Sequence, residues 1–102
     1  MADSPVFEWV CSAVEAATEF TPIEARGTVR IALKKGGLAA ATVTPAQMQV
    51  VVKRVLPEEL RRRGLDDAQG ICDGVSNRLV DQRFESEREN ESPEAVFARL
   101  GS

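Results

Sequence analysis

The sequence predicts an all-α fold, a compact bundle of four main helices followed by a short C-terminal helix. Two observations carry this prediction. Apolar residues recur at intervals of three and four along most of the chain, which is the spacing of one helix face. Hydroxyl–proline pairs stand where helices would start, and leucine–basic–glycine–leucine motifs stand where two of them would end. The hydroxyl–proline pairs are Ser4–Pro5, Thr21–Pro22, Thr44–Pro45 and Ser92–Pro93.

A hydroxyl residue directly before proline is a favourable helix start for two reasons. The hydroxyl oxygen accepts a hydrogen bond from a free backbone N–H of the first turn, and proline lacks an N–H that would have no helical partner there. Glu24 follows Thr21 by three residues, which predicts a reciprocal capping box at the second helix. Gln47 follows Thr44 in the same way at the third helix.

The first two helices are predicted over residues 5–18 and 22–35. Gly27 lies inside the second, where glycine costs about 1 kcal/mol relative to alanine, so we expect a neighbouring helix to pack closely against it. The predicted buried faces are Val6, Phe7, Val10, Val14 and Ala17 in the first helix, and Ala25, Val29, Ala32 and Leu33 in the second.

The third helix is predicted to start at Pro45 and to be kinked at Pro57. Proline removes a backbone hydrogen bond and clashes with the preceding turn, so the helix kinks or breaks near Leu56. The β-branched run at 50–52 would also suit a strand over 48–52. The capping box before this run and the helix-forming "PEELRRR" after it favour a helix. Its inward residues are Met48, Val51, Val52 and Val55.

The fourth helix is predicted over residues 67–84. Its expected start is Asp66, with Gln69 three residues further on as the capping partner. The inward face consists of Ala68, Ile71, Cys72, Val75 and Leu79.

Two motifs with the same spacing, "LKKGGL" at 33–38 and "LRRRGL" at 60–65, are interpreted as helix ends. Gly37 and Gly64 would take the left-handed conformation just past the helix, and the two leucines of each motif would touch. A phosphate-binding loop is the alternative. It is disfavoured because anions bind at helix N-termini, whereas these basic residues would lie at C-termini.

The chain divides into a predicted helical domain at 1–84 and a tail at 85–102. Residues 85–91 contain no apolar residue and carry a net charge of −3, which is typical of a solvated linker. The segment after them, "SPEAVFARLG", places Val96, Phe97 and Leu100 on one side of a short helix. This segment either docks on the domain or offers its apolar side chains to a partner.

Composition excludes several kinds of chemistry. The chain has no histidine, so Ser-His-Asp and Cys-His catalysis are excluded within it. Its two cysteines, Cys11 and Cys72, cannot make a four-ligand zinc site of the usual Cys/His kind and are expected to be buried thiols. The adjacent acids Glu58 and Glu59 do not face each other on a helix. We therefore expect no catalytic activity, no metal and no cofactor.

The predicted location and the charge distribution limit the kinds of partner that the chain could bind. No stretch approaches the ~20 apolar residues that a membrane span needs, and the acidic N-terminus resembles neither a signal nor a transit peptide, so we predict a cytoplasmic protein. Residues 21–65 carry a net charge of +6, between acidic segments on either side. This basic section would bind nucleic acid if its basic side chains lie together on one surface. Those bases are Arg26, Arg30, Lys34, Lys53 and Arg54.

The competing interpretation is that the basic section is balanced by the chain's own acids. The isoelectric point near 5.0 and the lack of aromatic residues among the bases favour this second interpretation. The predicted function is then a protein-interaction or regulatory module, and a homodimer through an exposed helix face is a further alternative. Tryptophan and phenylalanine are enriched in interface centres. The predicted partner-binding residues are Trp9, Phe20, Val96, Phe97 and Leu100.

Overall fold

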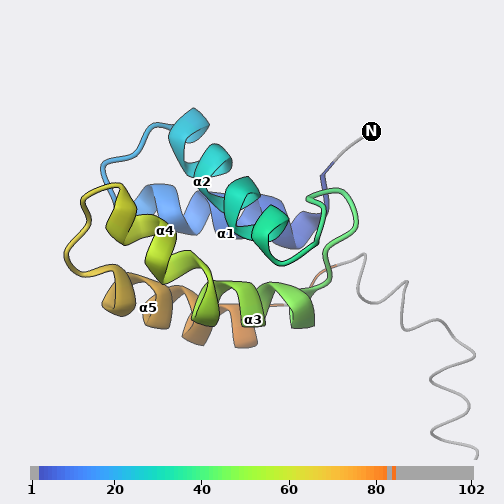
Figure 1. The fold of residues 1–102 in the computed structure, drawn as a ribbon. Coiled ribbons are helices and arrows are strands. Elements are labelled where there is room, and N and C mark those ends of the chain that lie inside the picture. The colour runs from blue at the N-terminus through green and yellow to red at the C-terminus, as the bar shows by residue number, and fades with distance from the viewer. Residues whose placement is uncertain (1–2, 83, 85–102) are drawn as a thin grey trace, which may run out of the picture.

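A computed structural model describes residues 3–82 and 84, and within them the chain forms five helices and no strand (Figure 1). The all-α prediction is confirmed. Residues 85–102, which include the predicted linker and tail helix, lie outside the described residues. The helices are α1 (Pro5–Ala17), α2 (Pro22–Lys35), α3 (Pro45–Arg54), α4 (Leu56–Arg62) and α5 (Ala68–Val80).

The helices pack in two groups around one core (Figure 1). Helices α1 and α2 pack against each other on one side, and α3 and α5 lie side by side on the other. Helix α4 contacts α2, α3 and α5 and so joins the two groups. Because α3 and α5 run in opposite directions, the start of α3 lies beside the end of α5.

Apolar side chains from all five helices form a single buried cluster. The predicted faces of α1 to α3 and of α5 lie in it, with three exceptions. Ala17 is exposed because the last three residues of α1 extend beyond the core, and Val55 and Ile71 are only partly buried. The largest fully buried side chains are Phe7, Leu33, Met48, Leu56 and Leu60.

The predicted helix starts are confirmed at α1, α2 and α3. Thr21 accepts a hydrogen bond from the Glu24 amide at 3.2 Å, and Glu24 accepts one from the Thr21 amide at 2.9 Å. The box at Thr44 has the same two bonds, at 3.1 and 3.0 Å. Ser4 accepts from the amide of Phe7 at 3.3 Å. Each of these helices therefore begins where the local sequence places it.

Both glycine motifs end helices in the predicted way. The amide of Leu38 donates to the carbonyl of Leu33 at 2.9 Å, and Gly37 between them has a φ of 75°. In the second motif Leu65 donates to Leu60 at 3.1 Å, with Gly64 at a φ of 90°. This six-to-one bond around a left-handed glycine is the Schellman arrangement, which satisfies carbonyls that the helix end leaves free.

Two predictions about helix geometry were wrong, and a third is made more specific. The predicted kink or break near Leu56 is present: α3 ends at Arg54 and α4 begins at Leu56, and Val55 between them has a φ of −111° and a ψ of −45°. The N-cap of α5 is Asp67 rather than Asp66, and it makes no side-chain capping bond. Helix α5 also ends at Val80, four residues earlier than predicted, since Asp81 and Gln82 close its last turn.

The predicted close packing at Gly27 was wrong as well. A Cβ atom built there meets nothing within 4 Å. Gly27→Ala should therefore add the helix propensity of alanine without a clash and raise the free energy of unfolding by up to about 1 kcal/mol. Urea denaturation followed by circular dichroism measures this change. Gly64→Ala is the matched control and should instead destabilise, because its φ is 90°; a loss of stability in Gly27→Ala would contradict the interpretation.

Candidate functional site

Trp9 lies at the edge of the core on α1. Its ring meets the ring of Phe84 edge-on, with centroids 6.5 Å apart, and the guanidinium of Arg78 lies 5.9 Å from its centroid. A shallow groove of about 210 Å³ runs beside it between α1 and α5, lined by Trp9, Ser12, Ala13, Ala16 and Arg78. Packing on two sides holds this indole in place, and part of it remains accessible.

Phe20, the second predicted contact, follows the C-terminal end of α1 and packs partly buried against the core. Its amide donates to Thr18 Oγ1 at 3.1 Å, which fixes the turn after the helix. A helix rises 1.5 Å per residue, so Phe20 leaves the chain roughly 12 Å or more from Trp9. The aromatic partner of Trp9 in the described residues is Phe84 and not Phe20. The other three predicted contacts, Val96, Phe97 and Leu100, lie outside the described residues.

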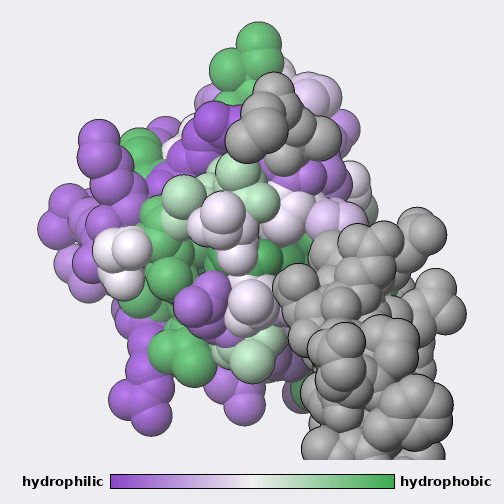
Figure 2. Space-filling model, turned by 90° about the vertical axis from the view of Figure 1, so that its right-hand side faces the viewer, coloured by the Kyte–Doolittle hydropathy of each residue, from purple (hydrophilic) through white to green (hydrophobic). Residues whose placement is uncertain are grey.

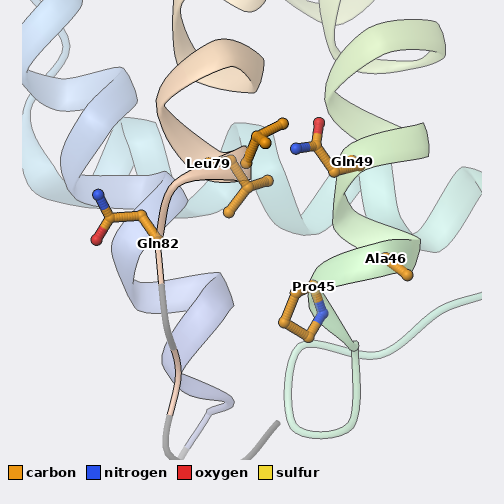
Figure 3. A pocket seen from close by; sticks show the side chains of 6 residues that line it. Pro45, Ala46, Gln49, Leu79 and Gln82 are labelled. Atoms are coloured by element: carbon orange, nitrogen blue, oxygen red, sulfur yellow. The ribbon is translucent and has the colours of Figure 1, made fainter.

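A second groove, of about 270 Å³, lies between the start of α3 and the end of α5 (Figure 3). Figure 3 shows Gln49 of α3 facing Leu79 of α5 across it. Val80, which lines the groove, is 70% exposed, and Val50 of α3, which is not among the lining residues, is 54% exposed. The residues that line the groove are Pro45, Ala46, Gln49, Leu79, Val80 and Gln82.

The side-chain amide of Gln49 at this groove is paired within the fold. Gln49 Nε2 donates to the carbonyl of Ser76 at 3.1 Å, and the hydroxyl of Ser76 donates to Gln49 Oε1 at 2.6 Å. Hydrogen bonding therefore leaves the groove with mainly apolar surface to offer. Its volume lies below the ~300 Å³ at which pockets for small-molecule ligands begin, so it fits the side chains of a peptide better than a small molecule.

Figure 2 looks at the end of the molecule where α3 begins and α5 ends. Hydrophobic residues appear in the middle of this face, with hydrophilic residues around them. Sequence reasoning missed this surface. The available signal was weak: Val50 and Val80 are apolar residues directly next to core positions but one step off the buried faces of their helices.

Two of the predicted nucleic-acid contacts, Arg26 and Arg30, are occupied by the chain's own acids. Arg26 donates through both guanidinium nitrogens to Glu8, and also to Asp3 at 3.0 Å. Arg30 donates to the same oxygen of Asp3 at 2.6 Å. Both guanidiniums lie over the ring of Phe7, at 5.4 and 5.2 Å from its centroid. The hydrogen bonds from Arg26 lower the pKa of Glu8, so this carboxylate stays charged and keeps the pair.

The other three predicted bases are placed differently. Lys34, Lys53 and Arg54 are exposed, and none forms an ion pair with an acid in residues 3–82. They come from the C-terminal turns of α2 and α3, where cations favour the helix dipole. The sequence-predicted basic surface therefore divides into a neutralised part on α2 and isolated exposed bases.

The adjacent acids Glu58 and Glu59 point to different partners. Glu58 accepts a bond from Arg62 at 3.2 Å on the surface. The side chain of Glu59 is only 6% exposed and is paired with Lys35, the last residue of α2, whose side chain is 39% exposed. The two carboxylates therefore do not form a shared acid–base site, and Glu59 instead ties α4 to α2.

Cys11 and Cys72 are buried free thiols. Burial raises the pKa of each to about 12. Within the described residues no group of three or more potential metal ligands occurs. No described helix has the length and apolar character required to cross a membrane.

The raised thiol pKa predicts slow alkylation of the folded protein. The thiolate reacts, and at pH 8 its population should be about a thousandfold lower than for a free cysteine of pKa ~8.5. The folded pKa lies above the unfolded one, so the thiols contribute stability below about pH 8.5 that is lost as pH rises towards 12. The rate at which a disulfide reagent reacts with the two thiols, measured with and without urea, shows how strongly the fold protects them. Ser12→Cys, at an exposed neighbour, is the control that should react at once; equally fast reaction of the unsubstituted folded chain would contradict the burial.

No protein-family model, curated protein or solved structure matches this chain. The functional argument therefore rests on the geometry of its own surfaces.

Proposed function

We propose that this chain is a protein-interaction module that binds the apolar face of a partner's amphipathic helix in the groove between α3 and α5. The observation that carries the proposal is the 70% exposure of Val80, an apolar residue in the lining of the larger of the two grooves; Val50, elsewhere on α3, is 54% exposed. Apolar side chains gain about 1.5–3 kcal/mol each when fully buried. A partner that covers both valines would recover a good part of that free energy.

Two further features support a helical peptide as the ligand. The groove runs between two antiparallel helices and is lined by apolar side chains and by Gln49, whose amide is already hydrogen-bonded, so a ligand need not supply a charge to pair with it. Helix-in-groove recognition uses apolar anchors spaced three and four residues apart. Both grooves include residues from the last turn of α5: Leu79 and Val80 line this one, and Arg78 lines the one beside Trp9.

Photocrosslinking at single positions tests the proposal. A photoreactive amino acid is placed at Val50, at Val80 or, as a control, at Ile31, which is 40% exposed on α2. We expect a discrete crosslinked protein from positions 50 and 80 and none from position 31. The crosslinked residues of that protein should lie on one apolar helix face, and Val80→Glu should abolish crosslinking at position 50. Crosslinks from position 31 alone would overturn the proposal.

Nucleic-acid binding is the second candidate, favoured by the exposed bases Lys34, Lys53 and Arg54. The ion pairs of Arg26 and Arg30 weigh against it, because binding phosphate would require breaking them. Fluorescence anisotropy of labelled duplex and single-stranded DNA at ~50 and ~200 mM salt separates the two candidates. The protein-interaction proposal expects no binding at micromolar protein. Salt-sensitive binding that is lost in the Lys53→Glu, Arg54→Glu double variant but kept in Val80→Glu would favour nucleic acid.

A further inference from the structure

We infer that residues 92–102 of this chain dock in the groove between α3 and α5, with Val96, Phe97 and Leu100 as the buried side of the docked segment. The inference rests on the proposed role of this groove as a docking surface. It also identifies an occupant that competes with a partner for the same apolar residues. Four observations support it: where the described fold ends, how long the linker is, how the apolar residues of the segment are spaced, and what charge the linker carries.

The described fold ends beside the groove. Gln82, two residues after the end of α5, is one of the groove-lining residues. Phe84 is buried and packs edge-on against Trp9, which fixes the point where the following residues leave the domain. The last described residues therefore lie at the end of the bundle where the groove is, with Gln82 in its lining.

The linker is long enough to return the segment to the groove. Residues 85–91 span up to about 24 Å when extended at ~3.4 Å per residue. Helix α5 has 13 residues, a length of about 20 Å at 1.5 Å per residue. Seven linker residues can therefore reach any part of a groove that starts at the end of α5. The linker has no apolar residue of its own with which to fill it.

The segment has the pattern of a helix that covers a narrow apolar surface. Ser92–Pro93 repeats the hydroxyl–proline start that begins α1, α2 and α3 in the described part of the chain. A helix from Pro93 places Leu100 on the same side as Phe97, three residues before it, and Val96, four residues before it. The same face spacing is what a groove between two helices accepts.

Charge complementarity points to the same surface. On α3, Lys53 follows Val50 by three residues and Gln49 by four, so it lies on the side of the helix that faces the groove. It is exposed and forms no ion pair within residues 3–82. The linker carries a net charge of −3. Docking would bring these acids near Lys53 while the apolar residues fill the groove.

Paramagnetic relaxation in the full-length protein tests the inference. Ser102→Cys supplies one reactive thiol for a nitroxide label, since Cys11 and Cys72 are buried. We expect the amide signals of Ala46, Gln49 and Val80 to lose more than half their intensity, while signals of α2 stay unchanged. Adding Phe97→Asp should restore the intensities, and adding Glu94→Gln, a conservative change on a polar residue of the same segment, should not.

Mixing experiments identify the source of the effect. Isotope-labelled unmodified protein is combined with unlabelled, spin-labelled protein, so that only contacts between molecules broaden signals. Broadening absent from this mixture but present in the single chain supports docking within one molecule. Equally strong broadening in the mixture assigns the groove to a second copy and overturns the inference, as does an unaffected groove. If position 80 crosslinks to a partner but the spin label causes no broadening, the proposed function stands and this inference is wrong. If the spin label broadens the groove signals but position 80 crosslinks to no partner, this inference stands and the proposed function is wrong.

Discussion

Replacing Phe7 with alanine is expected to lower the free energy of unfolding by about 3–5 kcal/mol, the range measured for buried phenylalanine. Phe7 is fully buried and heads the largest fully buried side chains of the domain. Its ring also supports the guanidiniums of Arg26 and Arg30, which lie 5.4 and 5.2 Å from its centroid. Since small domains are stable by only ~5–15 kcal/mol, this one substitution should leave a weakly folded or unfolded chain.

Phe7→Leu separates the two contributions of the ring. Leucine keeps most of the apolar volume but offers no aromatic face, so we expect a loss of about 1–2 kcal/mol. Urea denaturation of both variants gives the free energies, and Val10→Ala provides a cavity control at a buried residue of the same helix. A loss below about 1 kcal/mol in Phe7→Ala would mean that the site collapses around the cavity, and the assigned role of the ring would be wrong.

Lys35→Met is expected to destabilise the domain by about 2–3 kcal/mol, because it leaves the carboxylate of Glu59 buried without its charge partner. Breaking a fully buried ion pair costs about 3–5 kcal/mol. The lower value follows from the 39% exposure of the Lys35 side chain, which lets water screen the pair. For a domain of this size, a loss of this kind lowers the melting temperature by roughly 10 °C or more.

The neighbouring Lys34→Met is the matched control, since Lys34 is exposed and pairs with no acid in the described residues. It should change stability by less than about 0.5 kcal/mol. The double variant Lys35→Met, Glu59→Leu should recover most of the lost stability, because it removes the buried charge together with its partner. Equal effects of Lys35→Met and Lys34→Met in thermal denaturation would show that Glu59 does not depend on this ion pair.

The helix ends could be predicted from sequence because their signals are local. The capping box of Thr21 and Glu24 and the stop from Leu33 to Leu38 involve residues three to five apart, so no knowledge of the fold is needed. Pro57 was enough to predict an interruption near Leu56. Whether that interruption is a kink or a break depends on how α4 packs between α2 and α5, which the local sequence does not specify.

The candidate site was less predictable because it depends on which helices become neighbours. Trp9 was singled out by residue type alone, and its packing against Phe84 links residues 75 positions apart. The pairing of Arg26 with Glu8 followed the charge pattern, which already favoured an internally balanced basic section. By contrast, Val80 becomes part of a groove only because α3 and α5 lie side by side, and the local sequence of neither helix specifies that arrangement.

The contacts of the first described residues have a consequence for how the domain opens. Asp3 bonds to two arginines of α2, and the amide of Ser4 donates to the carbonyl of Ala40 in the α2–α3 connection at 2.8 Å. Chain ends usually fray first and exchange their amide hydrogens with solvent by small local fluctuations. Here the Ser4 amide is bonded to the α2–α3 connection, so we expect it to exchange more slowly than the amides of a frayed helix start.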